Sequence, residues 1–166
     1  RGIASETLRI GRIVENLLTL SRADAGEGPI VLKLIYLDDV VVEAANAARF
    51  LAAPRNIEIR VDKFEEAKIL GDAELLRQLV LILLDNAIKF SREGTRVAVC
   101  VGIVDGNAEV EVEDHGPGIP IEHLPHIFDR FFRGDVARTK SDSNSNAMAG
   151  QGAGLGLSIA QWIADA

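Results

Sequence analysis

Two glycine-rich segments carry the residue types that a nucleotide site needs. The first, Asp114-His115-Gly116-Pro117-Gly118, follows the alternating run 108–113, so Asp114 is expected at the mouth of a strand. The second, Gly152-Ala153-Gly154-Leu155-Gly156, opens an apolar stretch typical of a helix, and helix N-terminal amides bind phosphate. Glycine lets the backbone turn sharply or approach a ligand closely. An acceptor for an amino group and a cradle for anions together predict a nucleotide site, although Gly-Pro-Gly alone is usually only a turn.

A third candidate group is Asn86, within the apolar stretch 73–90. Burial of its amide is costly without hydrogen bonds, so Asn86 either lies on an exposed polar stripe or has a ligand. Its carbonyl oxygen suits magnesium, which takes oxygen donors and retains waters and phosphate oxygens. Lys89 lies about one turn further on the same face and can meet a phosphate. Phe90 would form a wall of the pocket.

Composition limits the class of protein. The 166 residues are 48% hydrophobic and 26% charged, as in a globular chain with a sizeable core. The net charge of −7 disfavours nucleic acid or an anionic membrane surface as the main partner. No signal peptide or long apolar span is present, so a cytoplasmic chain without direct membrane contact is expected. It begins at Arg1 in a helical pattern without Met, and so we expect a piece of a longer protein, which a membrane anchor could hold at the membrane.

The first 25 residues carry a heptad pattern. Ile3, Ile10 and Leu17 recur every seven residues, and Ile13 and Leu20 follow three residues after the last two. This a/d seam favours a dimerising helix, and a single amphipathic helix packed on its own domain is the alternative. The glycines and proline of segment 26–29 then predict a hinge.

Alternating and helical periodicities follow in turn. Strands are expected at 31–36, 57–61, 68–70, 96–104 and 108–114, and helices at 40–52, 73–90 and 155–164. Asp105-Gly106-Asn107 is a turn signal that predicts a hairpin of the last two strands. Asp38 or Asp39 is expected to cap the first of these helices and Asp72 the second. The polar stretch 134–152 predicts a lid. This order favours an α+β fold, a two-layer sandwich of a sheet and helices preceded by one long helix.

The motifs occur in a recognisable order. Asn86 with Lys89, Asp114-x-Gly116-x-Gly118, Ile127–Arg133 and Gly152-x-Gly154-x-Gly156 stand as the N box, first glycine box, F box and second glycine box do in bacterial two-component sensor histidine kinases. The chain therefore resembles the catalytic, ATP-binding domain of that family, which shares a superfamily with gyrase and chaperone ATPases. The resemblance implies the Bergerat-type sandwich with a mixed sheet, here without its C-terminal strands. It also implies residues 1–26 as the end of a dimerisation and phosphoacceptor helix and 27–166 as the catalytic domain.

The resemblance also implies roles for residues. Asp114 would accept a hydrogen bond from the adenine amino group, Gly116 and Gly118 would let the backbone curl around the base, and Ile119 would pack on it. Asn86 would ligate Mg²⁺, and Lys89 and Arg133 would neutralise phosphate charge. The remaining nucleotide-binding residues would be Phe90, Phe128, Phe131, Gly152, Gly154, Leu155, Gly156 and Leu157.

Some residues depart from the family pattern. His115, His123 and His126 lack the sequence context of a phosphoacceptor, which is therefore expected on an upstream helix. Ile82 stands one turn before Asn86, where gyrase-type ATPases place a general-base Glu, so a strand-passage or chaperone ATPase is disfavoured. The chain also stops at Ala166, before two strands that the family normally has.

The resemblance implies an ATP-dependent protein-histidine kinase. It would bind ATP with Mg²⁺, form a homodimer through its N-terminal helix, and serve the receiver domain of a response regulator. One alternative is a catalytically silent, nucleotide-responsive interaction module that signals by dimerisation. Another is a protein-serine kinase of the same superfamily.

Overall fold

The computed structural model describes residues 30–134 and 153–166. The predicted N-terminal helix, the hinge and all of the predicted lid except Gly134 lie outside the described residues. The described chain falls into two compact units, residues 30–119 and residues 120–134 with 153–166. Each unit is described by itself below.

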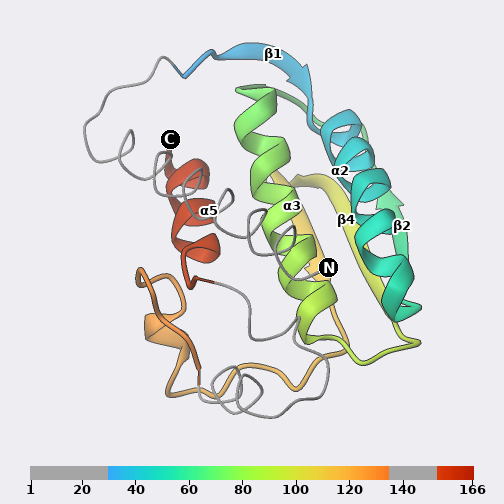
Figure 1. Ribbon diagram of the computed structural model, residues 1–166. Helices are drawn as coiled ribbons and strands as arrows, with labels where there is room; N and C mark the ends of the chain where they lie inside the picture. The colour runs from blue at the N-terminus through green and yellow to red at the C-terminus, as the bar shows by residue number, and fades with distance from the viewer. Residues whose placement is uncertain (1–29, 135–152) are drawn as a thin grey trace, which may run out of the picture. The chain divides into compact units, whose positions relative to one another are not determined.

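The unit of residues 30–119 contains a mixed three-stranded sheet (Figure 1). Its strands are β2 (Glu58–Phe64), β4 (Arg96–Val104) and β5 (Asn107–Glu113), in the order β2-β4-β5. β2 runs parallel to β4, whereas β5 runs antiparallel to it. A separate antiparallel pair joins β1 (Lys33–Tyr36) to β3 (Lys68–Gly71). The predicted strands and their mixed arrangement are confirmed.

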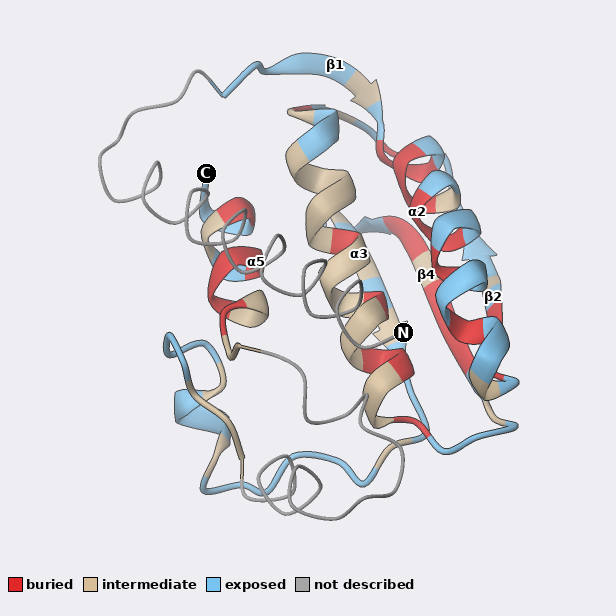
Figure 2. Ribbon diagram, viewed as in Figure 1, coloured by how far each residue is buried: buried red, intermediate tan, exposed pale blue. Residues whose placement is uncertain are grey.

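Two helices cover one face of the three-stranded sheet (Figure 1). They are α2 (Leu37–Ala52) and α3 (Ala73–Phe90). Successive side chains of a strand point to opposite faces, so Val97, Val99 and Val101 of β4 enter the core together. From the helices, Val41, Ala44 and Ala48 of α2 and Val80 and Leu84 of α3 are fully buried against them. Figure 2 shows the buried residues in red on α2, α3 and β4. The predicted two-layer packing of helices on a sheet is thus present in this unit.

The predicted cap of the first helix is wrong. α2 begins at Leu37, and Tyr36 occupies the N-cap position without a side-chain hydrogen bond. Asp38 lies inside the helix, buried, and its Oδ1 accepts a hydrogen bond from the N–H of Ala67 at 3.0 Å. The N–H of Leu37 donates to the Ala67 carbonyl at 2.8 Å. Backbone from a distant segment therefore replaces the expected local cap.

The hairpin between β4 and β5 confirms its sequence signal. Asp105 and Gly106 have φ angles of 50° and 82°. Two consecutive positive φ angles are the requirement of a type I′ turn, whose twist matches the twist of the flanking strands. The register pairs Val104 with Asn107 and Cys100 with Glu111.

Asp72 caps α3, as predicted from the sequence. Its Oδ1 accepts hydrogen bonds from the N–H groups of Glu74 and Leu75, and its Oδ2 accepts one from Val31 at 3.0 Å. Burial opposes ionisation of this carboxyl. The three N–H donors and the charge of Lys33 outweigh burial, so the pKa of Asp72 lies below its ordinary value.

Replacement of Asp72 by alanine should destabilise the fold in a pH-dependent way. At neutral pH we expect a loss of about 1 kcal/mol in the free energy of unfolding, the typical cost of losing an N-cap. A lowered folded pKa gives stability that is fully present above the unfolded pKa of about 3.9 and is lost as the pH falls through the folded value. Urea unfolding at pH 7, 5, 4 and 3 should therefore show the difference between wild type and variant shrinking below about pH 4. A difference that grows towards low pH would contradict this account of the cap.

The second unit contains a short 3₁₀ turn, η2 (Leu124–His126), and the helix α5 (Gly156–Asp165). The sequence predicts this helix from Leu155, which instead occupies the N-cap position. Its apolar face is buried at Leu155, Ile159, Ala160 and Ile163. None of the described helices in either unit has the length and apolar character needed to cross a bilayer.

Candidate functional site

The first glycine motif lies directly against the C-terminal turn of α3. A Cβ placed on Gly116 would stand 3.0 Å from the carbonyl oxygen of Phe90 and 2.7 Å from Asp114 Oδ1. The distance to the Asp114 oxygen is shorter than real Cβ contacts, and the distance to the Phe90 carbonyl is tighter than nine in ten of them, so a side chain at this position would force its neighbours to shift. The structure therefore places Gly116, with the Asp114 carboxylate bound to its N–H, beside the C-terminal end of α3, the helix that carries Asn86 and Lys89.

Asp114 holds this loop in place. Its Oδ1 accepts a hydrogen bond from the N–H of Gly116 at 2.7 Å, and its side chain is otherwise exposed. His115 ties the same loop to β4, because its Nδ1 lies 3.1 Å from the carbonyl oxygen of Arg96. An ionised carboxylate has further lone pairs on its second oxygen, so it can also accept from an amino group of a ligand.

The rest of the loop is open and apolar. Gly118 has a φ of +73°, with open space around the position that a Cβ would take. Ile119 follows and is 52% exposed. A large exposed isoleucine next to a carboxylate offers an apolar surface on which a flat base can pack.

Lys89 lies in the last turn of α3 and Asn86 just before that turn, and both are half-buried. The ammonium group of Lys89 forms an ion pair with the carboxylate of Asp85, four residues earlier. A phosphate group would therefore compete with Asp85 for Lys89. Such i, i+4 pairs are weak on a helix surface, so an ion carrying several charges can displace one.

The residues of this turn fit a magnesium ion held largely by a nucleotide. Asn86 offers a hard carboxamide oxygen, and Asp85 supplies negative charge on the same turn. Within residues 30–134 and 153–166, no group of three or more His, Cys, Asp and Glu side chains could hold a metal by itself. A magnesium ion at Asn86 would take its other ligands from phosphate oxygens and water.

In the second unit, Gly154 lies against the residues of the F box, Ile127–Arg133, called the F segment below. The N–H of Phe131 donates to the Gly154 carbonyl at 2.8 Å. Gly154 has a φ of +71°, and a Cβ there would stand 2.7 Å from the Phe132 carbonyl oxygen. Phe131 itself adopts a φ of 64°, an uncommon conformation for a residue with a bulky side chain. Two tight backbone contacts thus join the end of the F segment to the start of α5.

The remaining predicted residues are placed as follows. Phe128 and Phe131 are exposed, Arg133 is half-buried and engaged in interactions, and Gly156 and Leu157 form the first turn of α5 with Leu155 buried before it. Gly152 lies outside the described residues. Phe132, which the sequence does not single out, contacts the rings of His123 and His126, with ring centroids 5.5 and 5.9 Å apart.

Sequence reasoning also missed Arg55, at the end of the 3₁₀ turn η1 (Ala53–Arg55). Its guanidinium group donates hydrogen bonds to three backbone carbonyls at the end of α3. The sequence around Arg55 gives no sign of these hydrogen bonds, because the acceptors are 33 to 36 residues away along the chain.

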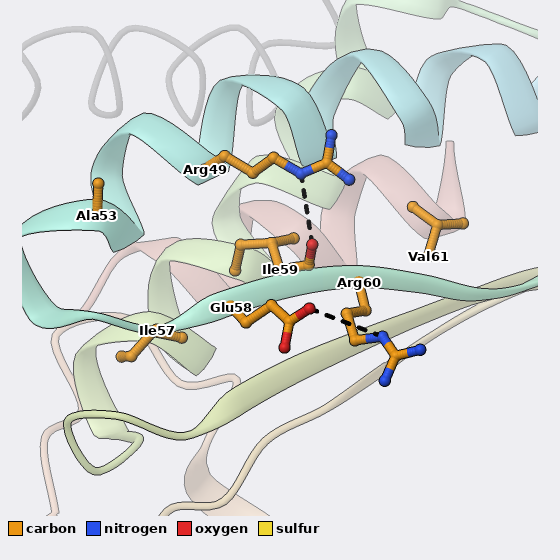
Figure 3. A pocket seen from close by; sticks show the side chains of 7 residues that line it. All are labelled: Arg49, Ala53, Ile57, Glu58, Ile59, Arg60 and Val61. Atoms are coloured by element: carbon orange, nitrogen blue, oxygen red, sulfur yellow. Dashed lines mark hydrogen bonds and ion pairs between the residues drawn. The ribbon is translucent and has the colours of Figure 1, made fainter.

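An open cavity of about 490 Å³ lies elsewhere in the same unit, between the end of α2 and the strand β2 (Figure 3). Arg49 donates through Nε to the Ile59 carbonyl at 3.4 Å, and Arg60 pairs with Glu58 and Asp62. The arginines of this cavity are thus already engaged by the protein, and none of the predicted nucleotide-binding residues lines it. We place the candidate site at the end of α3, where the predicted polar and charged side chains lie.

Comparison with known proteins decides the family. Residues 71–166 match the model of the histidine kinase-, DNA gyrase B- and HSP90-like ATPases. The chain belongs to this family. The match begins at the end of β3 and includes α3, the first glycine motif and α5, and ATP binding is the property that the family model describes.

Relatives narrow the class further. The chain is 34% identical over 142 residues to the signal transduction histidine-protein kinase AfsQ2 of Streptomyces coelicolor, a match covering 86% of this chain and 25% of the relative. It is 35% identical over 136 residues to the sensor-like histidine kinase SenX3 of Mycobacterium tuberculosis, covering 82% and 33%. The chain thus spans a quarter to a third of the length of these curated relatives.

Solved structures agree in fold. The mycobacterial sensor histidine kinase MprB superposes with a TM-score of 0.65 at 32% identity, over 80% of this chain and 78% of that chain. This ATPase-family domain is thus of the sensor histidine kinase type, and the predicted α+β class is confirmed.

Proposed function

We propose that this chain binds ATP together with Mg²⁺ as the catalytic domain of a sensor histidine kinase. The observation that carries the proposal is the contact between Gly116 and the Phe90 carbonyl, because it places Asp114 beside the turn of Asn86 and Lys89. A carboxylate that can accept from an adenine amino group and a carboxamide that can ligate a metal thus lie on neighbouring segments, the loop 114–118 and the C-terminal part of α3. The predicted domain boundary at residue 27 belongs to the same proposal.

Each group has a role that its chemistry supports. Asp114 accepts a hydrogen bond from the adenine amino group, and Ile119 packs on the base. Asn86 holds Mg²⁺, which when bound supplies charge neutralisation for the phosphate oxygens. Lys89 and Arg133 add positive charge to the phosphates, and the backbone around Gly154 presents amides to them. Phosphoryl transfer depends mainly on positioning and charge, so this set suffices without a general base.

The acceptor of the γ-phosphoryl group is a histidine that is none of the three in this sequence. His115 and His126 already engage the Arg96 carbonyl and Asp129, and His123 lies edge-on to Phe132. In the whole protein we expect a homodimer formed by the N-terminal helix, relay to the receiver domain of a response regulator, and a catalytic domain located in the cytoplasm.

Replacement of Asn86 by alanine tests this proposal. With a fluorescent ATP analogue, the wild-type chain should bind more tightly in magnesium than in EDTA. The variant should lose most of this difference and bind on the order of tenfold more weakly in magnesium, as expected for a lost charge-assisted contact. Asn46→Ala, on the exposed face of α2, is the matched control and should bind as the wild type does.

A different result selects the alternative. Binding that ignores magnesium and survives Asn86→Ala would favour the nucleotide-responsive interaction module over the kinase. Ile82, half-buried on α3 in place of a general-base Glu, agrees with either a kinase or that module but not with a water-activating ATPase.

A further inference from the structure

Arg55 fastens the C-terminal end of α3. Its Nη1 donates to the carbonyl oxygens of Ile88 and, at 3.0 Å, of Lys89. Its Nη2 donates to the carbonyl oxygen of Ser91 at 2.9 Å. One planar guanidinium group therefore holds three backbone carbonyls within a span of four residues.

These carbonyls have few other partners. The last four C=O groups of an α-helix lack an intrahelical N–H donor, and α3 ends at Phe90. The Ala87 carbonyl accepts from the N–H of Ser91 at 2.9 Å, which leaves the next two carbonyls to Arg55. Ser91 is only 2% exposed, and the three hydrogen bonds from Arg55 are partly buried. Removal of Arg55 would leave partly buried carbonyls without a protein donor, which costs free energy of folding.

Within residues 88–91, Arg55 leaves only the carbonyl of Phe90, and a Cβ on Gly116 would stand 3.0 Å from that oxygen. The same backbone segment thus contacts Arg55 through Ile88, Lys89 and Ser91 and contacts the first glycine motif through Phe90. A shift of this segment would move the loop of Asp114 as well as the side chains of Asn86 and Lys89.

Arg55 is itself held in place. Its carbonyl oxygen accepts a hydrogen bond from the N–H of Gly94 at 3.2 Å, in the loop that leads from α3 to β4. Asn56, which follows it, has a φ of 52° and closes η1 through a hydrogen bond to the Ala53 carbonyl at 3.0 Å. A guanidinium fork on a fixed backbone is a rigid clamp, whereas a lysine ammonium is a point charge on a flexible stem.

We propose that Arg55 is a positioning residue for magnesium-ATP: its clamp on the end of α3 sets the geometry of Asn86 against the loop of Asp114. The inference rests on the proposed function above. It adds a residue outside all four motifs, supplied by the 3₁₀ turn between α2 and β2.

The test compares Arg55→Ala and Arg55→Lys with wild type and Asn86→Ala. The quantity measured is the ratio of the Kd for a fluorescent ATP analogue in EDTA to its Kd in magnesium. Arg55→Ala should lower this ratio on the order of tenfold, the lower end of the effect of losing a partner that orients a metal ligand. Arg55→Lys should restore part of the ratio, because an ammonium group can still donate to these carbonyls but lacks the planar geometry that binds all three at once. Arg49→Ala is the matched control, since Arg49 also donates to a backbone carbonyl, that of Ile59 on β2, and should keep the wild-type ratio.

The outcomes separate the two proposals. A purely structural role for Arg55 would weaken binding equally in EDTA and in magnesium, and an unchanged ratio in a folded Arg55→Ala would overturn the positioning role alone. A wild-type ratio near one would overturn the proposed function together with this inference. If Arg55→Ala does not fold, Arg55→Lys decides: we expect a lowered ratio and faster hydrogen exchange at the Ser91 amide, and wild-type values of both would refute the clamp.

Discussion

Replacement of Asp114 by alanine should weaken ATP binding by roughly 10- to 100-fold, the range for losing a hydrogen bond to a charged group. The carboxylate accepts from Gly116 at 2.7 Å and, in the proposed complex, from the adenine amino group. Asp114→Asn separates these two roles. Its carbonyl oxygen can still accept from Gly116, but its NH₂ group opposes the amino group of adenine. We expect Asn to lose most of the affinity while the free energy of unfolding stays close to wild type.

Isothermal titration with ATP and urea unfolding of the same samples measure the two roles. Glu113→Gln, next to Asp114 at the exposed end of β5, is the control and should leave the Kd for ATP unchanged. Wild-type ATP affinity in Asp114→Asn would show that Asp114 only stabilises its own loop and does not bind the adenine base.

Replacement of Gly154 by alanine should produce the largest loss of stability. Alanine at a φ of +71° would be strained in the left-handed conformation, and its Cβ would also stand 2.7–2.9 Å from backbone atoms of Phe131 and Phe132. Left-handed strain and overpacking together predict a loss of about 2–5 kcal/mol in the free energy of unfolding. ATP affinity should fall as well, because the Gly154 carbonyl accepts from Phe131 and fixes the start of α5.

Gly94→Ala is the matched control for backbone strain. Gly94 has a φ of +75°, but nothing lies within 4 Å of the position of its Cβ. It should therefore lose only about 1–2 kcal/mol, the cost of the left-handed conformation. Urea unfolding followed by circular dichroism and by fluorescence of Trp162, on α5, compares both variants. Equal losses would show that the contacts of Gly154 with the F segment do not constrain the chain.

Local features of the fold were readable from the sequence. Asp72 caps α3 and Asp105-Gly106 forms the hairpin turn, because each acts on neighbours within a few residues. The prediction of Asp38 as a helix cap was wrong. Its buried carboxylate accepts a hydrogen bond from the N–H of Ala67, which is 29 residues away along the chain. Tertiary contacts of this kind leave no local pattern.

The residues of the candidate site likewise fall into those that the sequence indicates and those that it does not. Residue type and order indicated Asp114, Gly116 and Asn86, because their chemistry is specific. The pairing of Lys89 with Asp85 follows from an i, i+4 spacing that the sequence contains but that the functional interpretation passed over. Arg55 left no signal at all, since it acts only through backbone carbonyls, which every residue possesses.

Whether Asn86 and Asp114 serve one nucleotide is tested most directly by an NMR titration of the chain with magnesium and a non-hydrolysable ATP analogue. One binding event at the end of α3 predicts that the resonances of the Asn86 side-chain amide and of the Gly116 backbone amide shift together with a single Kd. The resonances of the Arg60 and Val61 amides, at the cavity between α2 and β2, should keep their chemical shifts. Shifts at Gly116 without Asn86, two unrelated Kd values, or shifts centred on Arg60 and Val61 would contradict a shared magnesium-ATP site.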